Sequence, residues 1–224
     1  MKKELNIGMS FSGGGYRAAT FDLGGLSFLN SIRLEDGRTL LECVTVLASV
    51  SGGTIPAMKY MLAQAHGQSV DEMVKEVFHF LCTEDLVTRA LSEMSAQKAN
   101  PDASLIKIMA GIYDDCLFGH AKIGDIIEKI DKLNVKDYTA LATDFDNSLP
   151  FRFRISNRKG VFGNNKHNIG PNVVQHITPG EALACSSCFP SGFEPMMYPT
   201  ISRSQNVMTS TRQTLHRSAS WMAV

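Results

Sequence analysis

The chain of 224 residues lacks the features that mark several specialised classes of protein. It has no run of 18 apolar residues that would span a membrane, and no apolar N-terminal segment typical of a secretory signal. Its 22 basic and 22 acidic side chains give a net charge of zero, which argues against a nucleic-acid-binding protein. With 44% hydrophobic residues, the composition is that of a globular domain whose core needs no disulfide or metal.

Cysteine is scarce, and its number is odd. The chain has five cysteines: Cys43, Cys82, Cys116, Cys185 and Cys188. Wide spacing without a secretory signal predicts free thiols and a reducing, cytoplasmic location. The C-x-x-C pair formed by the last two could be a redox or metal pair, or two small packed residues. Because no second pair follows at zinc spacing, we favour packing and expect neither a metal site nor a cofactor.

The zero net charge conceals an uneven distribution. Residues 1–146 contain 14 basic and 20 acidic side chains, a net charge of −6. Residues 147–224 contain 8 basic and 2 acidic side chains, a net charge of +6. This basic segment is compatible with peripheral contact with phospholipid head groups, and equally with ordinary charge scatter in a small chain.

Two predicted strands are each followed by a glycine-rich turn. Alternating side chains predict a strand over 5–12, which ends at Gly13-Gly14-Gly15 and leads into a helix over 16–32. Near-continuous apolar residues predict a buried strand over 43–50, followed by Ser51-Gly52-Gly53 and another helix. Such alternation predicts an α/β fold with a mainly parallel sheet. Both turns then lie at carboxyl ends of strands, where the sites of such sheets form.

The rest of the chain is organised as one domain over residues 1–199. Capping boxes predict helices that begin after Ser69 and Thr178. From residue 200 to 224 the chain is rich in Ser and Thr, lacks acidic residues and shows no apolar period, so we expect an irregular basic tail. Further helices are predicted over 84–97, 103–113 and 122–133, strands over 138–145 and 151–155, and a loop over 157–172.

The segment Ser49-Val50-Ser51-Gly52-Gly53 has the pattern of a nucleophile on a sharp strand-to-helix turn. Such a turn requires small residues two before and two after the nucleophile, and Ser49 and Gly53 satisfy this, although Ser49 replaces the glycine of a strict G-x-S-x-G. The following helix directs its N-terminal amides toward developing negative charge. A serine–glycine turn without chemistry is the alternative.

The segment Ser12-Gly13-Gly14-Gly15-Tyr16-Arg17 has the composition of an anion-binding loop. Three glycines allow successive backbone N–H groups to converge on an oxyanion or a phosphate. The strict phosphate fingerprints are absent, because position 18 is Ala and no G-K-[ST] follows. A nucleotide-binding role is therefore the weakest of the functional alternatives, and a pure packing role for the glycines stays open.

Together, these two motifs resemble the patatin-like phospholipase family of lipid acyl hydrolases. Two later stretches are also similar to that family: Ala140-Leu141-Ala142-Thr143-Asp144-Phe145-Asp146, and the segment from Glu181 to Pro190. The resemblance extends from about residue 5 to about residue 198. The order of the glycine and serine motifs is its most specific feature.

The resemblance implies a Ser–Asp dyad on a three-layer α/β/α fold. Ser51 would attack the ester carbonyl, and the N–H groups of Gly13, Gly14 and Gly15 would form the oxyanion hole. Arg17 would steady that loop. The implied substrate is a phospholipid or another fatty-acyl ester, with no cofactor and no nucleic-acid partner.

The sequence departs from the family pattern at the catalytic aspartate. The family has this residue in an Asp-Gly-Gly or Asp-Gly-Ala turn shortly after the segment matching Phe189-Pro190. Here Tyr198-Pro199-Thr200-Ile201 follows, and no aspartate occurs beyond Asp146. We therefore find no catalytic Asp, and we expect a C-terminally incomplete fold with impaired turnover. The alternative function is a non-catalytic lipid- or acyl-binding remnant of that fold.

A second catalytic arrangement follows from chain order alone. Ser51, then Asp144 or Asp146, then His167 or His176 reproduces the Ser…Asp…His order of α/β-hydrolases. With six histidines in the chain, such an order arises easily by chance, so we rank this triad below the dyad.

Overall fold

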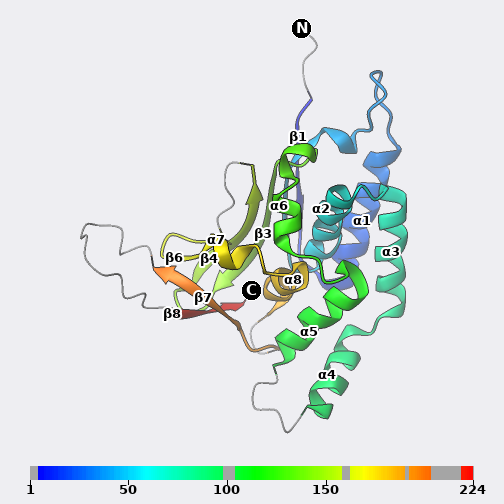
Figure 1. The fold of residues 1–224 in the computed structure, drawn as a ribbon. Coiled ribbons are helices and arrows are strands. Elements are labelled where there is room, and N and C mark those ends of the chain that lie inside the picture. The colour runs from blue at the N-terminus through cyan, green and yellow to red at the C-terminus, as the bar shows by residue number, and fades with distance from the viewer. Residues whose placement is uncertain (1–4, 98–103, 158–161, 190–191, 203–217, 224) are drawn as a thin grey trace, which may run out of the picture.

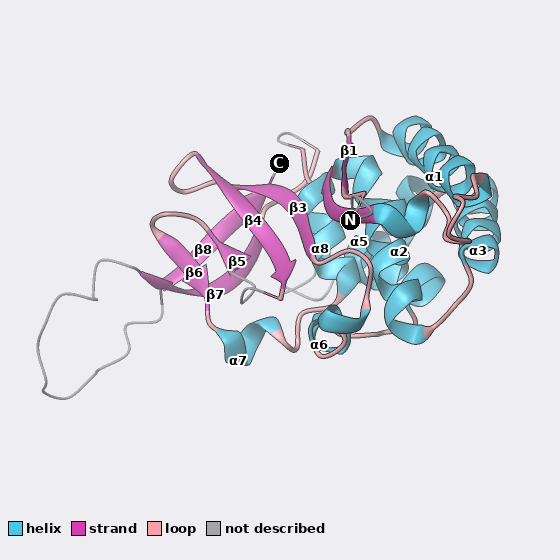
Figure 2. Ribbon diagram, turned by 90° about the horizontal axis from the view of Figure 1, so that it is seen from above, coloured by secondary structure: helices cyan, strands magenta, loops and turns pink. Residues whose placement is uncertain are grey.

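The structure is a computed structural model that describes residues 5–97, 104–157, 162–189, 192–202 and 218–223. It confirms the predicted mixed α/β class. The described strands form one sheet, and most of the helices gather at one side of it (Figures 1 and 2).

The N-terminal part of the sheet is parallel. Strand β1 (Ile7–Phe11) pairs with β2 (Val44–Val50), and β2 pairs with β3 (Asp137–Asp144). The register places Phe11 opposite Ser49, and Val50 opposite Leu141. Because the strands end at nearly the same level, the turns that follow β1 and β2 lie side by side.

Helix α1 (Gly15–Ser31) follows β1, and α2 (Thr54–His66) follows β2. Helices α3 (Val70–Thr83) and α8 (Pro179–Ser187) begin with the predicted capping boxes, at Ser69 and Thr178. The predicted helix over 122–133 is interrupted between α6 (Ile123–Ile127) and η4 (Ile130–Lys132). The remaining helical elements are η1 (Leu41–Cys43), η2 (Ser51–Gly53), α4 (Leu86–Ala96), α5 (Leu105–Tyr113), the π-helical turn η3 (Asp114–Phe118), α6 (Ile123–Ile127), η4 (Ile130–Lys132) and α7 (Pro171–Val174).

The sheet continues beyond β3 with antiparallel pairing throughout. Its remaining strands are β4 (Leu149–Ser156), β5 (Phe162–Gly163), β6 (His167–Ile169), β7 (Met196–Ser202) and β8 (Ser218–Ala223). They pair in sequence order, and β8 also pairs with β3, so that β3 to β8 close into a ring. Figure 2 shows these strands on the side opposite α1 to α3.

This arrangement corrects three expectations. Parallel pairing is confined to β1–β3, because the short turn between β3 and β4 can join only antiparallel strands. The predicted loop over 157–172 contains β5 and β6. The predicted irregular tail over 200–224 contributes the end of β7 and all of β8, while residues 203–217 lie outside the described part.

The helices cover one face of the parallel strands. On that face, Tyr138 and Ala140 of β3 are buried. On the opposite face, Val46 is 48% and Leu141 is 36% exposed. Within the described residues, β1–β3 therefore belong to a two-layer arrangement, and the implied third layer of a three-layer α/β/α fold is absent from them.

Candidate active site

Ser51 lies on a strained turn where β2 ends and α2 is about to begin. Its φ is 52°, in the left-handed region that a serine enters only at a cost of about 1–2 kcal/mol. Val50 before it is extended, and Thr54 after it is helical, so the chain reverses direction over η2. The sequence predicted this sharp turn, and backbone strain of this kind is typical of a nucleophile elbow.

The glycine loop after β1 contacts this turn. A side chain at Gly52 would overlap the backbone of Gly15, so only glycine permits this approach. A Cβ placed on Gly13 would lie 3.1 Å from the Cβ and 3.8 Å from the Oγ of Ser51. Gly14 and Gly15 have φ values of 144° and 61°, which make the turn into α1 possible. The two predicted motifs are therefore brought together, beside the unpaired first-turn amides of α1.

A chain of hydroxyl groups holds the serine turn from behind. The Ser51 N–H donates to Ser186 Oγ over 2.9 Å, and Ser186 Oγ donates to the Leu141 carbonyl over 2.7 Å. Thr54 Oγ1 lies 3.1 Å from the same Ser186 oxygen and donates to Ser49 Oγ over 3.0 Å. This network ties η2 to α8 and β3. Only its tertiary contacts reveal the role of Ser186, which no local signal in the sequence indicates.

A cavity of about 590 Å³ opens beside Ser51. Ser51, Gly52 and Gly15 contribute to one part of its lining. Its buried wall is mainly apolar or aromatic and includes Ile55, Leu86, Met109 and Tyr113. Ser51 and the glycine loop beside it therefore line a space that suits an alkyl chain.

Ser51 and Arg17, two residues predicted to belong to the catalytic site, lack the hydrogen bonds that this role would require within the described residues. Within the described residues, Ser51 Oγ makes no hydrogen bond, so no general base contacts it. Arg17 is exposed and forms neither a hydrogen bond nor an ion pair in that part of the chain. Nothing in the described contacts therefore gives Arg17 the loop-supporting role that the family resemblance implies.

One carboxylate near the turn escaped the sequence-based predictions. Asp22 on α1 is only 7% exposed, and its Oδ2 has no hydrogen-bond partner among the described residues. A Cβ on Gly53 would lie 2.9 Å from that oxygen, so the carboxyl group packs against the turn. Burial raises the pKa of Asp22 to about 6.

The alternative triad is assembled only in part. His167 Nδ1 lies 3.2 Å from the Asp144 carboxylate, as the chain-order hypothesis requires. Asn147 and Asn164 donate to the same carboxylate over 2.9–3.0 Å. Neither His167 nor Asp144 contacts Ser51 Oγ, and His176 instead lies 3.2 Å from the Gln175 amide. The aspartate and histidine thus form a cluster of their own.

The remaining predicted features have plain structural outcomes. Cys185 and Cys188 are buried free thiols, and burial raises the pKa of Cys188 to about 11. The described residues contain no grouping of three or more His, Cys, Asp or Glu suited to a metal ion. None of the helices in the described ranges combines the length and hydrophobicity needed to cross a bilayer.

No protein-family model matches the chain, and no curated protein matches its sequence. The functional interpretation therefore depends on the geometry around Ser51.

Proposed function

We propose that the protein is a lipid acyl hydrolase that cleaves fatty-acyl esters with Ser51 as the nucleophile. One observation carries the proposal: a serine in a left-handed turn is in contact with a glycine loop and faces a large apolar cavity. Each of these features also occurs singly in proteins that hydrolyse nothing. Together they supply a nucleophile, donors for an oxyanion and room for an acyl chain.

The reaction would begin with attack of Ser51 Oγ on the ester carbonyl. The carbonyl oxygen, as it becomes negative, would accept hydrogen bonds from backbone N–H groups of the Gly13–Gly15 loop. The N-termini of α1 and α2 both lie at this point and favour negative charge there. Collapse of the intermediate would break the bond to the alcohol oxygen, which takes up the proton lost by the Ser51 hydroxyl. Water would then add to the acyl-enzyme, and its proton would return to Ser51 Oγ as the fatty acid leaves.

A second candidate function is a non-catalytic acyl-binding protein. It is favoured by the absence of a hydrogen bond between Ser51 Oγ and any base in the described residues. A serine hydroxyl without such a partner is a weak nucleophile. This alternative keeps the cavity and the fold but predicts no acyl-enzyme.

Covalent labelling with an alkyl fluorophosphonate separates the two functions. If Ser51 is activated, the folded protein becomes labelled, and Ser51→Ala reduces the labelling rate by at least ~10³-fold. Mass spectrometry of the labelled peptide locates the adduct.

Ser187→Ala is the matched control, because Ser187 is the last residue of α8 and also lines the cavity. It should keep at least half of the labelling rate. Absence of labelling in a protein that circular dichroism shows to be folded would favour the binding function instead.

A further inference from the structure

The cavity beside Ser51 has a mouth of distinctive composition. Four of the residues that line the cavity lie between α3 and the first turn of α4 or just after α8, and we refer to them as its mouth: Glu84, Asp85, Val87 and Phe189. Val87 and Phe189 are 57% and 59% exposed, so the apolar lining continues to the surface. Among the described residues that line the cavity, two are acidic and none is Lys or Arg.

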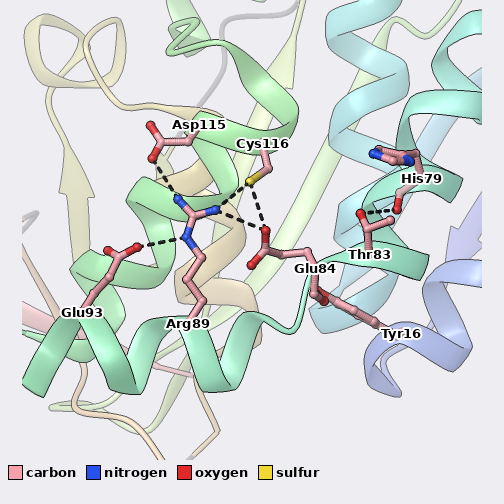
Figure 3. A network of polar contacts seen from close by, with 8 residues as sticks. All are labelled: Tyr16, His79, Thr83, Glu84, Arg89, Glu93, Asp115 and Cys116. Atoms are coloured by element: carbon pink, nitrogen blue, oxygen red, sulfur yellow. Dashed lines mark hydrogen bonds and ion pairs between the residues drawn. The ribbon is translucent and has the colours of Figure 1, made fainter.

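The acidic character of this mouth extends into the neighbouring network. Arg89 lies between the carboxylates of Glu84, Glu93 and Asp115, at 3.2, 2.9 and 3.5 Å (Figure 3). With Asp85, four carboxylates therefore accompany one guanidinium, which gives these five side chains a net charge of −3. One arginine cannot neutralise this group, and the mouth keeps a negative potential.

A side chain inside the cavity responds to the same potential. The Tyr16 hydroxyl donates to the Glu84 carbonyl over 3.2 Å. Burial, and after it the negative charges of Glu84 and Asp85, raise the pKa of Tyr16 well above its ordinary value of 10. Burial disfavours any charge, whereas the nearby carboxylates disfavour the phenolate and would favour a cation.

Aromatic rings complete the surroundings. Phe189 and Phe193 are perpendicular, with ring centroids 5.3 Å apart, and both line the cavity. Aromatic faces attract quaternary ammonium groups, and an adjacent carboxylate adds to that attraction.

From this arrangement we infer that the site selects acyl esters whose alcohol part carries a positive charge, a quaternary ammonium group in particular. The acyl chain occupies the apolar wall, the ester lies at Ser51, and the cation lies between the carboxylates of the mouth and Phe189. An anionic alcohol part meets repulsion and no cationic partner among the described lining residues. This inference rests on the proposed acyl-ester site and adds the charge of its substrate.

Binding to Ser51→Ala tests the inference without turnover. Three octanoate esters differ in the charge of the alcohol part: octanoylcholine, its neutral carbon isostere 3,3-dimethylbutyl octanoate, and anionic 3-sulfopropyl octanoate. Isothermal titration calorimetry should show about two- to fivefold tighter binding of the choline ester than of the neutral one, and the weakest binding for the sulfonate. Raising NaCl from 50 to 500 mM should reduce the preference.

Asp85→Asn, added to Ser51→Ala, is the decisive variant. Asp85 caps α4 by accepting from the Thr88 N–H, and asparagine caps helices equally well, so the fold should be retained. The preference for the choline ester should fall toward unity. Glu84→Gln should act in the same direction.

Glu35→Gln is the control for a change in charge at a distance. Glu35 lies beyond the far end of the 17-residue helix α1, about 25 Å from the end that meets the cavity. It should leave the preference unchanged. Equal binding of the charged and neutral esters, no binding of any ester, or a preference insensitive to both acidic variants would overturn the inference. Absence of fluorophosphonate labelling with the preference intact would instead overturn the hydrolase proposal alone.

Discussion

Two polar clusters lie where β2 and β3 end, and their central side chains differ in the number of hydrogen bonds that they make. At the end of β2, Ser51 has a strained backbone and an Oγ without a hydrogen bond in the described residues. At the end of β3, the buried Asp144 carboxylate is bound by Asn147, Asn164 and His167. The first cluster faces a cavity, whereas the second lies in the closed part of the sheet.

This difference indicates how to separate a reactive group from a structural one on the same sheet. A reactive group must keep hydrogen-bonding capacity for its substrate, so other residues of the protein do not occupy all of its hydrogen-bonding positions. A buried ion that serves stability is surrounded by donors, since an unpaired buried charge is costly. By this criterion, Asp144 and His167 stabilise the turn after β3, although their residue types alone suggest catalysis.

The largest expected effect comes from separating the serine turn after β2 from the glycine loop after β1. Gly52→Ala places a Cβ against the backbone of Gly15, so the glycine loop must shift. We expect the fluorophosphonate labelling rate to fall by ~100-fold or more, and the free energy of unfolding to fall by about 3 kcal/mol. Labelling kinetics and urea denaturation measure the two effects.

Gly24→Ala is the control for Gly52→Ala. Gly24 lies within α1, and a Cβ there meets nothing within 4 Å. It should leave labelling unchanged and stabilise the helix by about 0.5–1 kcal/mol. Unaltered labelling in Gly52→Ala would show that the contact between the two turns is dispensable.

A substitution in the second cluster should lower the stability of the protein and leave the fluorophosphonate labelling rate unchanged. Burial raises the pKa of Asp144, but the hydrogen bonds from Asn164, Asn147 and His167 outweigh it and hold the pKa below its ordinary value. Its stabilisation is therefore present above about pH 4, and is lost as the pH falls through the lower pKa of the folded state. Asp144→Asn should cost about 2–3 kcal/mol at pH 7 and less at pH 3.

Denaturant titrations across this pH range test the prediction. Glu35→Gln removes an exposed charge that makes no hydrogen bond or ion pair within the described residues, and it should change stability by less than about 0.5 kcal/mol. A loss of labelling in Asp144→Asn without a loss of stability would reverse the assignment of this cluster and revive the triad.

An intermediate effect is expected at Asp22, the carboxyl group beside Gly53. Its pKa is raised to about 6, so folding favours the protonated form. The contribution of Asp22 to the free energy of unfolding is greatest below about pH 4, and it declines as the pH rises toward 6. Asp22→Asn should stabilise the protein by about 2 kcal/mol at pH 8 and remove that decline. A decline that persists in the variant would assign it to another group.

The smallest expected effect concerns the strain at Ser51 itself. Ser51→Gly relieves the left-handed conformation and should stabilise the protein by about 1 kcal/mol, while labelling is lost. Ser51→Ala keeps the strain and should not stabilise it. Equal stability of the two variants, measured by urea denaturation, would indicate that the turn is not strained in solution.

The sequence predicted the elements whose signals are local. The capping boxes at Ser69 and Thr178 marked the starts of two helices, and glycines marked both turns of the site. Ring closure of β3 with β8 depends on pairing between distant segments, which no local pattern reports. Asp22 and Ser186 were missed for the same reason, since only packing brings them to the serine turn.

Closure of that ring also has a consequence for the order of folding. The parallel strands β1, β2 and β3 and the residues that hold the serine turn, including Ser186, all precede β8 in the chain. The ring closes only when Thr143 pairs with Ala223 of β8. During synthesis on the ribosome, the serine turn can therefore form before β8 has been synthesised.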